Sequence, residues 1–219
     1  MLQRDYHVIL PVLDGHAGSD RPFTSIEENA AGIISYIDRH LGGAVLMIGG
    51  LSLGAQILLE MLSQRNNICR YALVERAMAI PSGLTHALIV PAFGFSYALI
   101  RNRSFAKAQF RSLHITPELF EDYYRDTCRI DKEDMIAFLR ASTSYAPKPA
   151  LQNCRADILL VVGEKEQKKM LRSAQLLQGM LSKSALEIKK GLYHGEFSIN
   201  CPRQYVEVLH RMLPGKERG

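Results

Sequence analysis

The chain has 219 residues, of which 47% are hydrophobic and 22% charged, and a formal net charge of +5. This length suits one good-sized domain, or one domain with an inserted subdomain, with enough apolar residues for a substantial core. The basic residues are scattered and form no stripe with interleaved aromatic residues, which argues against a nucleic-acid partner. The four cysteines are far apart and form no C-x-x-C pair, which argues against a disulfide framework or a zinc site and suits a reducing, cytoplasmic compartment.

The N-terminus, M-L-Q-R-D-Y-H-V, shows no signal-peptide pattern. One segment, between Arg76 and Arg101, contains no Lys, Arg, Asp or Glu and is long enough to cross a bilayer. Pro81, Gly83 and Pro91 interrupt this segment. We therefore expect it to be a buried or lid-like apolar segment and expect no membrane span.

The first third of the chain predicts strands that alternate with helices. Residues 6–13, Y-H-V-I-L-P-V-L, predict a buried strand. Ser25 and Glu28 form a capping-box pattern at the start of a helix that would end near residues 42–43. The wholly apolar residues 44–48 predict a strand covered on both faces, followed by a helix over 55–62.

After a short strand at 71–74 the pattern predicts only helices from residue 82 to 150, one of them starting at Thr116-Pro117-Glu118. Alternation then resumes, with strands over 156–163 and 186–190 and helices over 169–181 and 202–213. Strands that alternate with helices predict an α/β fold with a mostly parallel sheet and flanking helices. We expect residues 1–81 and 151–219 to form this core and residues 82–150 to be an inserted helical cap over the strand ends.

Ser52 lies in the pattern Gly50-x-Ser52-x-Gly54, between the predicted strand and the helix that follows it. Small neighbours would let the backbone turn sharply and leave the serine hydroxyl clear as a nucleophile. The N–H group of Leu53, at the helix N-terminus, would then face the substrate oxygen as an oxyanion donor. The alternative is that Ser52 is only a small turn residue.

A serine nucleophile needs a histidine to take its proton and an acid to hold that histidine in the useful tautomer. His194 follows a late predicted strand in the segment G-L-Y-H-G, between small or flexible neighbours. Glu164 and Glu166 follow the strand before it. The order of serine, acid and histidine along the chain is the order expected of one fold in particular.

Several segments together resemble the motifs of the α/β-hydrolase family, over nearly the whole chain. They are residues 10–19 for the strand-and-loop motif P-D-L-P-G-H-G-x-S, 50–54 for the nucleophile elbow, 163–166 for the G-x-x-D acid turn and 191–195 for the histidine loop. The resemblance implies a helical cap at 82–150. It implies that Glu166 is the acid, with Glu164 as its neighbour and Glu75 as the alternative in members that carry the acid one strand earlier.

The resemblance also marks a departure at the N-terminus. In the family the strand at 6–13 is usually the fourth, preceded by three strands and an H-G loop that supplies the second oxyanion donor. A chain that lacks these three strands and this loop would have a gap in its sheet between the strand at 6–13 and the one at 44–48. Backbone N–H and C=O groups would be exposed in that gap. We therefore expect a truncated chain, a re-paired sheet, or a homo-oligomer that covers the gap.

The resemblance implies a serine hydrolase that acts on an ester-type, small-molecule acyl substrate through Ser52, His194 and Glu166, with no metal and no cofactor. The alternative is a non-catalytic or crippled module of the same fold that binds a small apolar ligand or a partner protein. The fold alone cannot select among substrates, or between hydrolysis and acyl transfer.

Overall fold

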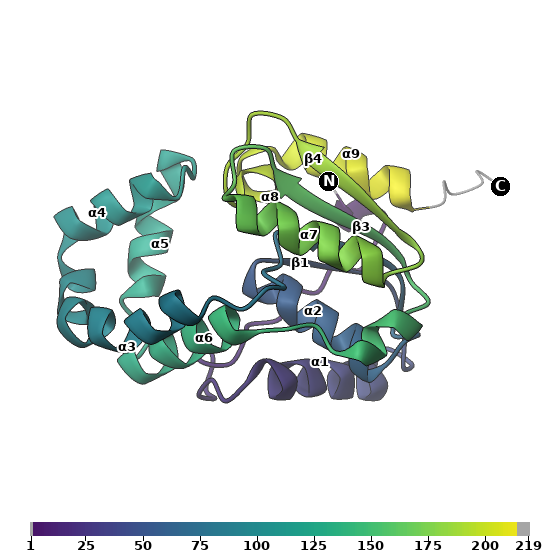
Figure 1. The fold of residues 1–219 in the computed structure, drawn as a ribbon, viewed down its shortest axis with the longest axis horizontal. Coiled ribbons are helices and arrows are strands. Elements are labelled where there is room, and N and C mark those ends of the chain that lie inside the picture. The colour runs from purple at the N-terminus through teal and green to yellow at the C-terminus, as the bar shows by residue number, and fades with distance from the viewer. Residues whose placement is uncertain (1, 214–219) are drawn as a thin grey trace.

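The computed structural model describes residues 2–213, the side chain of Phe95 excepted. Within them four parallel strands form one sheet in the order β1-β2-β3-β4 (Figure 1). The strands are β1 (Val45–Leu51), β2 (Cys69–Glu75), β3 (Asp157–Gly163) and β4 (Ser184–Lys189). The predicted α/β class and the four strands expected from residue 44 onward are confirmed, with bounds shifted by a few residues.

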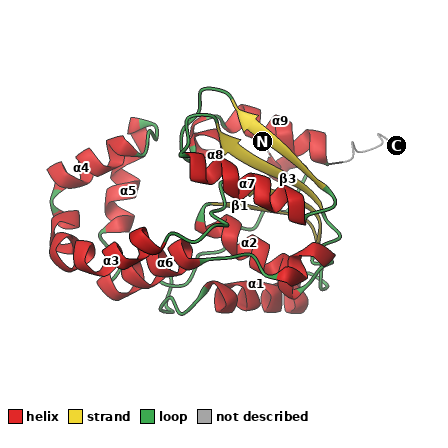
Figure 2. Ribbon diagram, viewed as in Figure 1, coloured by secondary structure: helices red, strands yellow, loops and turns green. Residues whose placement is uncertain are grey.

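Helices cover both faces of this sheet (Figure 2). They are α1 (Ile26–His40), α2 (Leu53–Gln64), α7 (Lys168–Met180), α8 (Glu196–Asn200) and α9 (Pro202–Met212). Alternate residues of β2 point to opposite faces, as the strand period of two requires. Val74 packs in the cluster that contains α1 and α2, whereas Leu73 packs against Phe197 of α8 and Leu209 of α9. Both faces are therefore apolar, which explains why the strands lack the alternation of half-exposed strands.

The start of α1 follows the predicted capping pattern. The Oγ atom of Ser25 accepts a hydrogen bond of 3.0 Å from the backbone N–H of Glu28. This bond satisfies one of the N–H groups that a helix start leaves without a partner. The helix ends at His40 and is capped by Leu41, which precedes the two glycines expected near its end.

Residues 6–13 were expected to be a buried strand, and this expectation is wrong. In the structure they form no regular secondary structure and pair with no strand among the described residues, and Leu10 and Val12 are 86% and 57% exposed. An extended segment becomes a strand only where a neighbour takes up its N–H and C=O groups. Apolar composition alone therefore does not make residues 6–13 a strand. Because these residues do not pair with β1, it is an edge strand of the described sheet.

Residues 82–150 are helical, as predicted. The helices are α3 (Gly83–Ser96), α4 (Arg103–Ser112), α5 (Phe120–Thr127) and α6 (Lys132–Ser144), with 3-10 turns η2 (Tyr97–Arg101), η3 (Pro117–Leu119) and η4 (Pro149–Asn153) between and after them. A further 3-10 turn, η1 (Leu2–Arg4), begins the described chain. Thr116 precedes η3 without capping it, and the longer helix after it starts only at Phe120. No helix within residues 2–213 is long and apolar enough to cross a membrane.

The helical block stands beside the sheet at one end of the molecule, in teal at the left of Figure 1. Gln56 of α2 bonds to the segment that leads into this block and to α6, its last α-helix. Its Nε2 atom donates hydrogen bonds to the backbone oxygens of Met78 (2.8 Å) and Ser142 (2.9 Å), and the residue is fully buried. The block is therefore anchored one helical turn from Ser52. Its treatment as a separate cap domain with boundaries at 82 and 150 stays a prediction.

Candidate active site

Ser52 lies between β1 and α2 in a backbone conformation that non-glycine residues rarely adopt, with φ 54° and ψ −114°. Such a conformation costs about 1–3 kcal/mol and is kept only where the surrounding structure holds it. Here the backbone N–H of Ser52 donates to the carbonyl oxygen of Glu75 (3.0 Å), and its own carbonyl accepts from Gln56 (3.1 Å). The serine therefore stands on a tight strand-to-helix turn, as its sequence pattern predicts.

The two glycines of the pattern differ in their surroundings. A Cβ atom on Gly50 would lie 2.5 Å from the carbonyl carbon of Gly54 and 2.7 Å from the nitrogen of Ala55, both backbone atoms that cannot move aside. A Cβ atom on Gly54 would meet nothing within 4 Å. The small neighbours that the sequence pattern places beside Ser52 are therefore required at Gly50 but not at Gly54, because the turn closes over residue 50 only.

Leu53, the expected oxyanion donor, is the first residue of α2. The first N–H groups of a helix have no acceptor within it, and the helix dipole places partial positive charge there. Its N–H is thus available for a negatively charged oxygen, provided that the reacting group lies beside Ser52.

The loop that carries His194 connects β4 to α8 and lies against the turn that carries Ser52. Gly191 and Gly195 bend it at positive φ, 76° and 68°. A Cβ atom added to Gly195 would lie 3.5 Å from Cδ2 of Leu51, the residue just before Ser52. The structure therefore brings the histidine loop and the serine turn together, although 142 positions separate Ser52 from His194 in the sequence.

The imidazole of His194 is largely buried, and its Nδ1 atom has no hydrogen-bond partner among the described residues. Burial, and then the positive charge of Arg76, lower the pKa of His194 to about 4. Both effects disfavour the charged imidazolium. The ring is therefore neutral near pH 7, the state in which it can accept a proton.

Glu166, the expected acid, does not hydrogen-bond to His194 in this structure. Its Oε2 atom accepts from Nε of Arg76 at 2.7 Å, and its side chain is only 4% exposed. Glu164 is engaged elsewhere, since its Oε2 atom accepts from the backbone N–H of Gly191 (2.8 Å). The acid turn is nevertheless close to the histidine loop, because the N–H of Lys165 donates to the carbonyl of Leu192 (3.0 Å).

Glu75, the alternative acid, ends β2 and is buried. Its Oε1 atom accepts from the backbone N–H of Ser198 in α8 (3.3 Å), and its Oε2 atom has no partner among the described residues. Burial raises the pKa of this carboxyl group, with hydrogen bonding from Ser198 opposing the shift. Glu75 therefore lies on the α8 side of the sheet, and no hydrogen bond to His194 is described for it.

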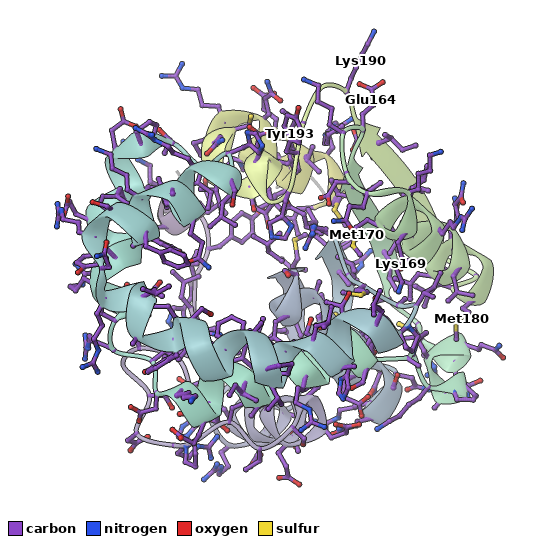
Figure 3. All side chains as sticks on the ribbon, turned by 60° about the vertical axis from the view of Figure 1, so that its left-hand side comes forward. Glu164, Lys169, Met170, Met180, Lys190 and Tyr193 are labelled. Carbon is purple, nitrogen blue, oxygen red and sulfur yellow. The ribbon has the colours of Figure 1, made fainter. Side chains whose placement is uncertain are left out.

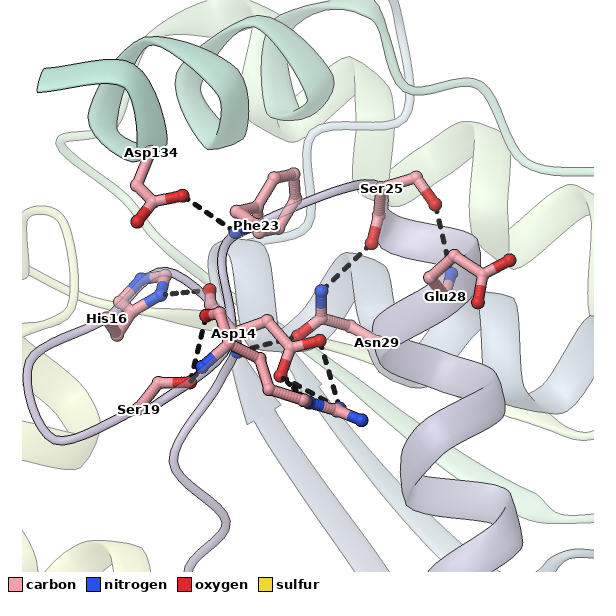
Figure 4. Close-up of polar contacts among 9 residues, drawn as sticks. Asp14, His16, Ser19, Phe23, Ser25, Glu28, Asn29 and Asp134 are labelled. Atoms are coloured by element: carbon pink, nitrogen blue, oxygen red, sulfur yellow. Dashed lines mark hydrogen bonds and ion pairs between the residues drawn. The ribbon is translucent and has the colours of Figure 1, made fainter. Parts of the chain in front are cut away.

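His16, in the loop that follows residues 6–13, has structural contacts only. Its ring stacks on Phe138 of α6 at 4.7 Å, and its Nδ1 atom lies 3.1 Å from the carbonyl oxygen of Asp14. Asp14 is held by Arg21, and Asp134 of α6 accepts from the N–H of Phe23 (Figure 4). These bonds fix the loop between α1 and α6, beside a polar cavity of about 250 Å³.

The helical block also touches the histidine loop directly. The ring of His114, after α4, stacks on Tyr193 with centroids 4.1 Å apart, and Asn200 donates to the carbonyl of His114 (2.7 Å). Figure 3 shows Tyr193 between the helical block and the core. Sequence reasoning missed this contact, since His114 belongs to no motif and Tyr193 fills a variable position of the histidine loop.

Sequence reasoning also missed Arg76, which holds Glu166 and acts on the pKa of His194. A signal for it existed. It is the first residue after β2, at the carboxyl edge where the catalytic groups were sought, and it is charged.

Among the residues that the structure describes, no group of three or more His, Cys, Asp or Glu side chains could hold a metal ion. The chemistry that the arrangement can support is nucleophilic attack by a serine with a neutral imidazole nearby.

Three solved structures share this architecture. They are an esterase from Thermogutta terrifontis (TM-score 0.75, 16% identity, 96% of this chain and 81% of that chain), an esterase from Exiguobacterium antarcticum (0.73, 19%, 91% and 78%) and a meta-cleavage product hydrolase from Pseudomonas fluorescens (0.72, 19%, 96% and 80%). At such identities the likeness shows the fold alone. No curated protein shows significant sequence similarity to this chain.

The family comparison goes further than the fold. The model of the alpha/beta hydrolase family matches residues 1–207, which include the serine turn, the acid turn and the histidine loop. The expected resemblance is thereby confirmed, and the chain belongs to the α/β-hydrolase family.

Proposed function

We propose that this chain is a serine hydrolase that cleaves a carboxylic ester through an acyl-enzyme intermediate. Membership of the family supports hydrolase activity in general. The observation that carries the finer proposal is the strained turn at Ser52, with the loop of His194 packed against the preceding Leu51. Strain of this kind is kept at functional sites, and a plain turn would use glycine.

In the proposed reaction the Oγ atom of Ser52 attacks the ester carbonyl carbon while His194 takes its proton. The oxyanion accepts a hydrogen bond from the N–H of Leu53, and His194 returns the proton to the departing alcohol. Water, deprotonated by the same imidazole, then attacks the acyl-enzyme; the bond to Oγ of Ser52 breaks, the imidazole returns its proton to that oxygen, and the acid is released. No metal or cofactor enters this sequence.

Glu166 is the proposed orienting acid, although it pairs with Arg76 in the structure. Only its Oε2 atom is used in that pair, and no partner is described for Oε1. The Oε1 atom would accept the Nδ1–H of His194, which itself has no described partner. The hydrogen bonds that tie the acid turn to the histidine loop support this pairing.

A fluorophosphonate probe tests the proposal, since it reacts with activated serines. The wild-type chain should be labelled at Ser52, the Ser52→Ala variant should not be, and Ser63→Ala in α2, the helix that follows Ser52, should be labelled like the wild type. Absence of label on a protein that circular dichroism shows to be folded would contradict the proposal.

A second candidate is a non-catalytic module of the same fold that binds a small apolar ligand or a partner protein. The unpartnered Nδ1 of His194 and the pairing of Glu166 with Arg76 favour it, because a working triad needs the acid on the imidazole. The same probe decides between the two, since a binding module would stay unlabelled.

A further inference from the structure

Arg76 occupies the strand position next to Ser52 at the carboxyl edge of the sheet. In the register of β1 and β2, Leu51 pairs with Glu75, and the N–H of Ser52 donates to the carbonyl of Glu75. Neighbouring strands lie about 4.8 Å apart. The cation at position 76 therefore lies in the immediate surroundings of the proposed nucleophile. No step of the proposed reaction uses this cation.

The backbone of Arg76 is held in an unusual conformation that fixes the direction of its side chain. Its φ is 54°, the left-handed region that favours glycine, and its N–H donates to the carbonyl of Val161 in β3 (2.9 Å). A long, non-glycine residue kept in this region is a departure from local preference that points to a role at the site.

Only one of the three guanidinium nitrogens of Arg76 has a described hydrogen-bond partner. Its Nε atom donates to Glu166, whereas no partner among the described residues is recorded for its two Nη atoms. The side chain is 21% exposed, so solvent or a ligand can reach it. A guanidinium presents donors along more than one edge, so one carboxylate can orient it while another edge binds a second anion.

The other groups at this place leave room for a negative charge. The charge of Arg76 acts on His194 and lowers the pKa of its imidazole, which places the cation near the proposed base. The carboxyl group of Glu75, the residue before Arg76, is buried and faces α8, where its Oε1 atom accepts from the N–H of Ser198 (3.3 Å). Lys189 adds no free positive charge here, because its Nζ atom pairs with Glu187 (2.9 Å), so Arg76 is the cation that this place offers.

We propose that the free Nη edge of Arg76 binds a carboxylate on the substrate, so that the preferred ester carries a negative charge on its acyl part. The inference rests on the proposed function at Ser52 and names its substrate class. A bound carboxylate would offset the cation beside His194, so the same contact that selects the substrate would also favour proton transfer to the imidazole.

The experiment compares p-nitrophenyl hemiesters of succinate, glutarate and adipate, which keep a free carboxylate, with neutral p-nitrophenyl esters of matched chain length. For at least one length the ratio of kcat/KM, charged over neutral, should exceed one in the wild type. It should fall about ten- to a hundredfold in Arg76→Gln, the size of a lost charge-assisted contact. Arg70→Gln, at the other end of β2, removes the same charge and should keep the ratio.

Two further variants separate binding from folding and from catalysis. Arg76→Gln leaves Glu166 buried without its partner, so the double variant Arg76→Gln, Glu166→Gln is measured beside it, and both should lose glutarate binding. Ser52→Ala, which cannot turn over, should bind glutarate by calorimetry as the wild type does.

A ratio of one or below for all three lengths, or a ratio unchanged in Arg76→Gln, overturns the inference even if Ser52 is labelled and neutral esters are cleaved. Glutarate binding that depends on Arg76, without labelling or hydrolysis, would instead support the anion site and contradict the proposed function.

Discussion

Ser52 and Arg76 directly follow the neighbouring strands β1 and β2, and each has a positive φ of 54°. The N–H of Ser52 bonds to the carbonyl of Glu75, and the N–H of Arg76 bonds to the carbonyl of Val161, so each residue is tied to the next strand along the sheet. The carboxyl edge of the sheet thus holds two strained residues side by side, at the place where the proposed chemistry occurs.

Replacement of Ser52 by glycine should stabilise the protein while it removes the nucleophile. Glycine adopts the conformation of residue 52 without steric cost, so the free energy of unfolding should rise by about 1 kcal/mol. Ser52→Ala is the matched control, since it also lacks the hydroxyl but keeps the Cβ atom and should show no such gain. Urea denaturation of the three proteins measures the difference, and equal stabilities of the two variants would contradict the strain argument.

The two glycines of the serine turn should respond differently to alanine. Gly50→Ala places a methyl group against the backbone of Gly54 and Ala55, so it should destabilise the protein by about 1–3 kcal/mol or more and abolish labelling of Ser52. Gly54→Ala has open space and a better helix former, so stability should stay the same or rise by up to about 1 kcal/mol. Thermal unfolding and probe labelling test both. If Gly50→Ala keeps its stability and its labelling, the turn can open to accept the methyl group, and the prediction is wrong.

The acid of the proposed triad can be assigned by amide substitutions. Glu166→Gln should lower kcat/KM about a hundredfold or more, because the imidazole loses its orienting partner. Glu164→Gln removes only the charge of a side chain that accepts from the backbone N–H of Gly191, and it should change the rate little. Glu75→Gln is the decisive comparison. If it causes the larger loss while Glu166→Gln stays active, the acid is the one at the end of β2.

How far the sequence predicted this molecule depends on whether a feature is local. The cap at Ser25, the turn at Ser52 and the helical run after residue 82 follow from neighbouring residues, and the structure confirms them. Residues 6–13 have the composition of a strand, but strand formation needs a partner that lies elsewhere in the chain, and the described residues supply none.

The candidate site divides in the same way. The loops of Ser52, Glu166 and His194 were found from spacing and from the order of strands, and these loops do pack together. The pairing of Glu166 with Arg76 could not be predicted from spacing, because it depends on which side chain lies beside the buried carboxylate in the folded protein. An ion pair across 90 positions leaves no pattern in a single sequence.

The depressed pKa of His194 makes stability depend on pH over a defined range. Burial, and then the charge of Arg76, lower the pKa from 6.5 to about 4, so the unfolded chain binds a proton more readily than the folded one between these values. The stabilisation is complete above pH 6.5 and is lost as the pH falls toward 4, by up to about 3 kcal/mol. His194→Gln should flatten this part of the profile, whereas His210→Gln, on the exposed surface of α9, should leave it in place.

The same lowered pKa of His194 sets the acid limb of the pH–activity profile. A base that stays neutral down to about pH 4 should let the free enzyme keep its kcat/KM between pH 7 and 5, where an ordinary histidine would lose most of its basic form. Stopped assays with an ester across pH 4–8 measure this limb. In Arg76→Gln one of the two causes of the low pKa is gone, so its limb should move to higher pH. An acid limb near pH 6.5 in the wild type would mean that the imidazole is less buried, or further from Arg76, than the structure has it.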